Sequence, residues 1–489
     1  MGVNPRLHFE FKRTTPALLL LVLMEIAVGP VASRAQNPTS AANPFYGSVT
    51  AQPVTGEPLK LSLDDAVQRG LKNNLGLKEA ENGEKAQHGM KNEAVQEFLP
   101  TIWLTGDTGY YMHNLAAQGF GPKTIAEFAP LFPGGKLPAG IKNITRDDLT
   151  EGQIHFSQIL FSGPVIQGWK AAVSAERSAY FNKMTARGEV VQQVAIAYLR
   201  AIADESQVVN AKALVAQAQL LLDHVHAAHE AGTVANLDEL RARVQLAAQQ
   251  QALTAAENQQ AKDLIQLKRE IGIDPGQEIV LSDPAPYSDL AEETPEEVRA
   301  LAYRSRQDYQ NLQNQAVELK ALHAVYRSER LPTLSFYSFY GTSTVNGAGT
   351  HGDFAAVGTL NFPIFREARL RGDEDASKAE MASVDAQLAD LRNHIDEQVR
   401  SALLDVSANK QLVDVARSNV DLATRALSDE TDRVNAGVDD NLPLVTAQAS
   451  LATAENNLVE SLYEYNVSKL MLARAAGVLE QQYRLYLGR

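Results

Sequence analysis

The chain contains no cysteine among its 489 residues. This absence excludes disulfides, thiolate zinc sites, cysteine nucleophiles and attachment of a lipid to an N-terminal cysteine. Basic residues are also fewer than acidic ones. The chain has 45 Lys and Arg and 59 Asp and Glu, so its net charge is −14. Nucleic-acid-binding proteins present basic surfaces, so we expect no nucleic acid among the partners of this acidic chain.

The sequence also lacks the motifs of the common catalytic sites. It contains no nucleophile elbow, no P-loop, no dinucleotide-binding glycine fingerprint and no zinc-protease motif. Carboxylates are abundant, but in long helical patterns they are typical of solvated faces. We therefore expect a protein that is not an enzyme and that holds no cofactor.

Long apolar runs are absent except for one near the N-terminus. The run 17–24 follows several basic residues and is too short to span about 30 Å of hydrocarbon as a helix. A small-x-small cleavage pattern ends at Ala35. We expect residues 1–35 to be a secretory signal peptide. The alternative is an N-terminal anchor helix, which Glu25 and Pro30 would interrupt.

Proline is missing from two long stretches. None of the 20 prolines lies within 165–274 or 364–442. Because proline in a helix interior costs about 3 kcal/mol, these stretches favour long helices. We expect helices over about 165–231 and 366–436, each about 100 Å long. Helices of this length do not fit a compact domain, and they indicate coiled-coil packing or a tube.

Short motifs occur twice along the chain in the same order. Leu99-Pro100-Thr101 is matched by Leu331-Pro332-Thr333, and the Ala-Gly pair at 231–232 is matched by the pair at 436–437. The near-constant offset between such matches predicts an internal duplication. One insertion in the first copy, between Pro100 and Phe161, accounts for the change in offset.

Each copy is expected to contain a helix, a strand, a loop, a second strand, a long helix and a return helix. Pro100 and Pro332 mark the strand entries, and Gly232 and Gly437 mark the turns of the helical hairpins. The expected segments are a signal peptide (1–35), an N-terminal linker (36–60), a first repeat (61–292), a second repeat (293–480) and a C-terminal tail (481–489). The expected strands cover about 101–111, 151–162, 333–341 and 353–365, and the return helices cover about 236–272 and 442–477.

The four strand segments are more apolar on one side than on the other. In the last one, Phe354, Leu360 and Phe362 share one parity, whereas Thr359 and Asn361 share the other. A tilted strand needs about 9–11 residues to cross a membrane. Lipid forbids open sheet edges, so four strands in a membrane would require several chains, and three chains would supply twelve strands. The alternative is two hairpins of a soluble β-domain.

Taken together, these features resemble the TolC-type outer membrane factors. The resemblance rests on the signal peptide, the opening LSLDDAVQRGLKNN at 61–74, the two Leu-Pro-Thr strand entries, the duplicated long helix and the two Ala-Gly turns. The turns are followed by helices rich in Ala, Gln, Glu and Asn, and the resemblance covers roughly residues 60–480.

The resemblance implies a fold and a function. The fold is mostly α with a β-barrel portion: a homotrimer whose four strands per chain close a 12-stranded transmembrane barrel in the outer membrane, continued by an α-helical tunnel in the periplasm. The insertion 112–150 would be a long extracellular loop. The implied function is passive efflux of drugs, metals or proteins through a channel that works with a periplasmic adaptor protein and an inner-membrane pump.

A constriction ring is expected at the periplasmic tip. Some members of this family place two aspartates just after the second turn, but the corresponding positions here are Pro443 and Thr446. Other acids lie nearby, and a ring of like charges at a narrow pore attracts cations. The alternative is solvated turn acids that favour the helix dipole. The candidate ring residues are Asp439, Asp440, Asp238 and Glu239.

Three histidines, His224, His226 and His229, lie just before the first glycine turn. His226 and His229 are one helical turn apart and could share a metal ion. His224 faces a different side of the helix, and surface histidines near a helix C-terminus are the simpler interpretation. We therefore assign no metal site.

Two functions follow from the sequence. The first is an outer membrane efflux channel, and the second is a periplasmic or surface coiled-coil scaffold or adhesin with β-hairpin tips. They differ in where the strands lie, so membrane fractionation distinguishes them.

Overall fold

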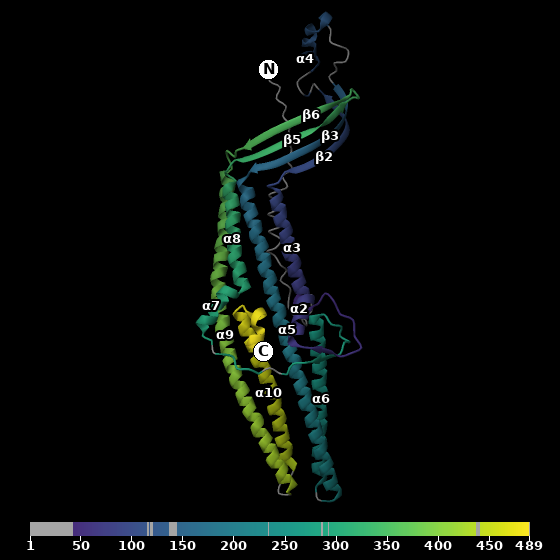
Figure 1. Ribbon diagram of the computed structural model, residues 1–489, viewed down its shortest axis with the longest axis vertical. Coiled ribbons are helices and arrows are strands. Elements are labelled where there is room, and N and C mark those ends of the chain that lie inside the picture. Colours follow the sequence, from purple (N-terminus) through teal and green to yellow (C-terminus); the bar gives the residue numbers. More distant parts are fainter. Residues whose placement is uncertain are drawn as a thin grey trace.

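The computed structural model describes residues 43–114, 117, 121–135, 144–232, 234–284, 287–291, 293–436 and 441–488. The expected signal peptide, the second turn glycine Gly437 and the acids Asp439 and Asp440 lie outside these residues. The molecule is elongated, with a β-sheet at one end and two helical hairpin tips at the other (Figure 1).

Each copy opens with two helices whose lengths match between the copies. The first helix has 11 residues in both copies and the second has 22. The Ser62 side chain caps the first of them, and Thr294 forms a capping box with Glu297 at the equivalent place. The helices are α2 (Leu63–Asn73) and α3 (Leu75–Gln96) in the first copy, and α7 (Pro295–Ser305) and α8 (Gln307–Ser328) in the second.

The proline-free stretches form the two longest helices. They contain 68 and 69 residues, which corresponds to about 100 Å each. Each turns at its lower end into a return helix that runs back beside it (Figure 1). None of the described helices is both long and apolar enough to cross a bilayer. These helices are α5 (Gly163–Glu230), α6 (Asn236–Ile271), α9 (Glu367–Asn435) and α10 (Asn441–Ala475).

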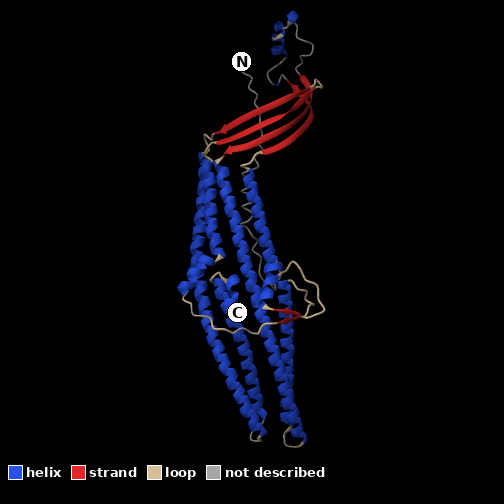
Figure 2. Ribbon diagram, in the orientation of Figure 1, coloured by secondary structure: helices blue, strands red, loops and turns tan. Residues whose placement is uncertain are grey.

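A four-stranded antiparallel sheet lies at the other end of the molecule (Figure 2). Its order is β2-β3-β5-β6, so each copy contributes one hairpin. A turn with Asn346 and Gly347 at positive φ joins the second hairpin. The strands are β2 (Thr101–Asn114), β3 (Ile144–Phe161), β5 (Thr333–Val345) and β6 (Thr350–Asn361).

The β2–β3 hairpin is longer than the sequence pattern suggested. β2 reaches Asn114, and β3 begins at Ile144, where these two residues pair. Both ends of the insertion 112–150 therefore belong to the sheet rather than to the loop, because the backbone ladder continues beyond the apolar residues. The described part of the insertion also contains α4 (Pro122–Glu127) and two 3-10 turns, η3 (Ala129–Leu131) and η4 (Pro133–Gly135).

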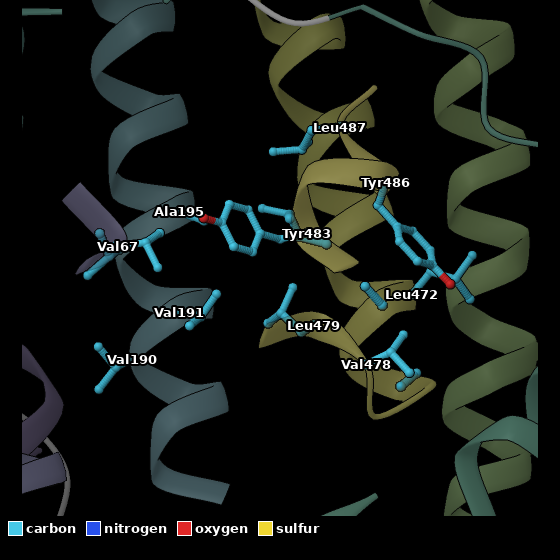
Figure 3. Packing of buried hydrophobic residues seen from close by; sticks show 14 of the residues in the cluster. Val67, Val190, Val191, Ala195, Leu472, Val478, Leu479, Tyr483, Tyr486 and Leu487 are labelled. Atoms are coloured by element: carbon cyan, nitrogen blue, oxygen red, sulfur yellow. The ribbon is translucent and has the colours of Figure 1, made fainter. Parts of the chain in front are cut away.

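The middle of the molecule holds the largest apolar core. Short segments from the N-terminal linker and from the end of the first copy meet there: η1 (Pro44–Tyr46) packs on the helices, and β1 (Leu59–Leu61) pairs in parallel with β4 (Ile279–Leu281). The expected C-terminal tail largely forms a helix instead, α11 (Leu479–Tyr486). Tyr483 points from α11 toward α5 and is buried with Tyr486 and Leu487 (Figure 3). Burial of these side chains explains why this segment is ordered against the core.

Candidate functional site

The two faces of the sheet differ in chemistry. The strand register places Leu104, Ile154, Tyr340 and Phe354 in one row across all four strands. Their exposed fractions range from 49% to 78%. A contiguous row of large exposed apolar side chains is unusual on a surface in water and marks a surface for lipid or for another protein.

The opposite face carries a hydrogen-bonded histidine cluster. His155 in β3 is buried, and its ring stacks on Trp103 in β2 with 5.0 Å between ring centroids. Its Nε2 lies 2.8 Å from Thr105 Oγ1, and its Nδ1 lies 2.8 Å from the Tyr337 hydroxyl in β5. Both ring nitrogens therefore have partners, and the cluster ties three strands together on a face that also carries polar residues.

The outer strands of the sheet have open edges. Within the described part of the chain, β2 and β6 each pair with a single neighbour. An edge strand presents unpaired N–H and C=O groups, which neither lipid nor an apolar surface can satisfy. In lipid, this sheet would therefore need further strands to cover both edges.

The first helical hairpin, formed by α5 and α6, turns at Gly232, at the tip of the molecule. Helix α5 ends at Glu230, Gly232 has φ 76°, and its N–H donates to the His229 carbonyl at 2.8 Å. Glycine adopts this left-handed conformation without the strain that a side chain would cause. The candidate acids Asp238 and Glu239 follow in the first turn of α6.

Glu239 is buried at the tip and is held by basic residues. Its carboxylate accepts a hydrogen bond from Arg243 at 2.5 Å, and it lies 3.0 Å from His226 Nδ1 and 3.9 Å from His229 Nε2. Burial raises the pKa of Glu239, but the hydrogen bonds with Arg243 and His226 outweigh burial, so the pKa falls below its usual value. Asp238 also has a partner, with Arg241 Nη1 3.2 Å away.

The histidines are thus connected by a carboxylate that the sequence analysis did not assign to them. His226 and His229 share Glu239, whereas His224 is exposed. In the described residues, no group of three or more His, Asp or Glu side chains is arranged to hold a metal ion. The signal was present in the sequence, because folding the hairpin about Gly232 brings positions 226 and 239 to nearly equal distances from the turn.

An apolar cluster joins the two hairpins near their tips. Leu221 and Val225 of α5, Ala242 of α6 and Leu444 of α10 are buried together. The strand entries Pro100 and Pro332 lie at the opposite end, directly before β2 and β5. The chain therefore has two candidate functional regions, a sheet with two chemically different faces and a charged helical-hairpin tip.

Comparisons with known proteins identify relatives of this chain. The family model described as outer membrane efflux protein matches residues 66–272 and 301–478, which is one segment in each copy. The toluene efflux pump outer membrane protein TtgF of Pseudomonas putida is 24% identical over 330 residues. The match covers 64% of this chain, and the chain spans 64% of the length of that relative.

Solved structures show the same fold. A membrane protein from Pseudomonas aeruginosa superposes with a TM-score of 0.71 at 18% identity, covering 92% of this chain and 96% of that chain. The CmeC outer membrane channel of Campylobacter jejuni superposes with a TM-score of 0.69 at 15% identity, covering 92% of this chain and 94% of that chain.

Proposed function

The chain belongs to the outer membrane efflux protein family, and on that premise we propose that it is a passive trimeric duct of a tripartite efflux system. The protein is an outer membrane protein, and its long helices would extend into the periplasm. The duct performs no chemistry of its own. It supplies a water-filled path, and its selectivity depends on its narrowest part and on the pump behind it.

The open sheet is the observation that carries this proposal. Four strands with an apolar face, a more polar face and two open edges are stable in lipid only when the edges are closed. Three copies would close a barrel of twelve strands, with the row containing Leu104 and Phe354 toward lipid and the His155 face toward the lumen. The long helices would continue this lumen for about 100 Å.

The cargo is proposed to be small molecules, with proteins as a further cargo class of the family. TtgF is named for toluene efflux, which supports apolar organic compounds as one cargo class besides drugs and metals. A periplasmic adaptor protein and an inner-membrane pump are the proposed partners, because a passive duct needs an energy source. Outer membrane lipid would contact the apolar face of the sheet.

The constriction is proposed to lie at the tip, where Gly232 ends the first helical hairpin and where α9 is followed by α10. In the first copy, arginines neutralise both Asp238 and Glu239. We therefore expect Asp439 and Asp440 of the second copy to supply most of the negative charge of the ring. A ring of this kind would favour cations over anions.

Membrane fractionation is the first experiment. A duct protein stays in the outer membrane fraction after a mild alkaline wash, whereas a coiled-coil scaffold or adhesin held by surface contacts is released. Release into the wash would contradict the duct.

Planar-bilayer conductance of the purified protein is the second experiment. We expect discrete cation-selective steps, and we expect the double variant Asp439→Asn, Asp440→Asn to lose most of the cation preference. Asp375→Asn is the matched control, because this exposed residue lies on α9 far from the tip. Unchanged selectivity in the double variant would contradict the proposed charged ring but would not contradict the proposed duct.

A further inference from the structure

One arginine in the helical body faces three carboxylates from three helices. Arg200 of α5 has its Nε 3.3 Å from Asp204 of the same helix and 3.9 Å from Asp263 of α6. Its Nη1 lies 3.2 Å from both carboxyl oxygens of Glu460 on α10. Since α5 and α6 form the first hairpin and α10 belongs to the second, this single guanidinium links the two hairpins.

Asp204 is the unusual member of this cluster. Its side chain is only 1% exposed, and neither carboxyl oxygen receives a hydrogen bond from the described residues. A buried carboxylate without a donor is costly, and two adjacent carboxylates usually share a proton. Burial, together with the hydrogen bond that a protonated Asp204 makes with Asp263, raises the pKa of Asp204 to about 7, although Arg200 acts in the opposite direction.

We propose that Asp204 and Asp263 bind one proton between them and that this proton controls how firmly Arg200 holds Glu460. The cluster is then a proton-operated latch between the first hairpin and α10. The latch concerns contacts within one chain, so it does not depend on the proposed duct function.

The direction of the switch follows from the charges. With the proton bound, the pair carries one negative charge, its hydrogen bond is satisfied, and Arg200 remains shared with Glu460. When the proton leaves for water, two adjacent negative charges compete for the same guanidinium in a buried place. Glu460 is the most exposed of the three carboxylates, with 45% of its side chain accessible, so it is the one that water can take over. Raising the pH therefore releases α10.

The other groups around Asp204 and Asp263 do not supply the hydrogen bond that the shared proton gives to Asp204. From α6, the amide of Gln259 donates to Asp263 at 2.9 Å, which leaves Asp204 without a donor. From α10, the Tyr463 ring lies 5.1 Å from the Arg200 guanidinium, and Glu464 and Glu460 add negative charge near that ring. On α5 itself, Arg200 is the cation that faces Asp204.

The absence of cysteine makes the latch directly measurable. Spin labels are attached to the full-length protein through Ala213→Cys on α5 and Thr453→Cys on α10, two exposed positions on the tip side of the cluster. Labelled chains are diluted with unlabelled ones, so that distances within one chain dominate. Pulsed electron paramagnetic resonance then gives the α5–α10 distance distribution at about pH 5 and about pH 8.

We expect the ratio of long to short distances to rise about tenfold between these pH values, which corresponds to a pKa of the Asp204–Asp263 pair that is about one unit lower in the released arrangement than in the latched one. Asp204→Asn and Asp263→Asn each remove the shared proton site without adding charge, and both should keep the short distance at both pH values. Arg200→Gln should show the long distance at both.

The matched control is Glu205→Gln, an exposed position next to Asp204 that should behave as the unsubstituted chain. A measurement of oligomer size checks that each variant folds. If Asp204→Asn does not fold, Asp263→Asn tests the same proton site. A distance distribution that ignores pH in the unsubstituted chain, or a pH response that survives in a folded Asp204→Asn or Asp263→Asn protein, would overturn the latch.

Discussion

At the scale of single residues, the helical body contains buried groups that exchange protons near neutral pH. Glu270 of α6 is fully buried, and Gln193 and Gln266 donate to one of its oxygens at 3.2 and 3.0 Å. Burial raises the pKa of Glu270 to about 7, and burial lowers the pKa of Lys469 on α10 to about 8. The charge of the buried core therefore changes with pH between about 7 and 8.

Glu270 predicts how stability depends on pH. Its carboxyl binds a proton more tightly in the folded chain than in the unfolded one, so its contribution is full at acidic pH and is lost as the pH rises through about 7. Glu270→Gln removes this loss. We expect the variant to be more stable than the unsubstituted protein at pH 8, by on the order of 1–3 kcal/mol, with a smaller difference at pH 5.

Thermal unfolding followed by circular dichroism at the two pH values checks this expectation. Glu257→Gln, a half-exposed position on the same helix, is the control and should leave the pH dependence unchanged. Identical pH profiles for Glu270→Gln and the unsubstituted protein would show that this carboxyl does not titrate in the folded state.

At the scale of elements, glycine has opposite effects in a turn and in a helix. Gly232 has φ 76° with open space around it, so Gly232→Ala meets no neighbour but strains the backbone. Gly83 lies inside α3 with equally open space. We expect Gly232→Ala to destabilise the tip by about 1 kcal/mol and Gly83→Ala to stabilise α3 by about 0.5–1 kcal/mol.

Hydrogen exchange measured peptide by peptide separates these two effects. Exchange should speed up in the peptides around the first turn for Gly232→Ala and slow down in those of α3 for Gly83→Ala. Faster exchange in both variants would mean that packing, rather than backbone conformation, decides their effect.

The sequence was most informative about elements whose signal is local. Proline spacing indicated α5 and α9, and the position of Gly232 indicated the end of a helix. Most contacts between elements were not accessible, because they depend on which helix faces meet. The Glu239–His226 contact is the exception, since both positions lie at similar distances from Gly232, but its signal was not used. The contact of Glu239 with His226, the cluster around Arg200 and the docking of Tyr483 all join residues from different helices. The full length of β3 was missed because polar residues continue its ladder.

At the scale of the whole molecule, the sheet edges decide the assembly. Strands β2 and β6 are the outer strands of the four, so they do not meet within one described sheet. In a closed barrel, β2 of one chain would lie beside β6 of the next. Cysteine pairs scanned along β2 and β6 should therefore form disulfides between chains and yield covalent trimers on denaturing gels.

The control pair is Thr105→Cys with Gln153→Cys, which face each other across β2 and β3 and should form a bond within one chain. Because the sequence contains no cysteine, only the introduced cysteines can form disulfides in the β2–β6 scan and in the control pair. If no β2–β6 pair gives a product larger than a monomer while the control pair closes, the barrel would have to be built differently.

The docking of α11 has a practical consequence for anyone who handles this protein. Tyr483 donates a hydrogen bond to Asp64 at 2.6 Å, and the C-terminus lies at mid-height of the helical body (Figure 1). A purification tag fused there would emerge at the waist of the assembly, inside the cell envelope, and would stay hidden from antibodies applied to intact cells. An epitope meant for display at the cell surface would instead be placed between β2 and β3, the end of the molecule that the proposed orientation puts outside the cell.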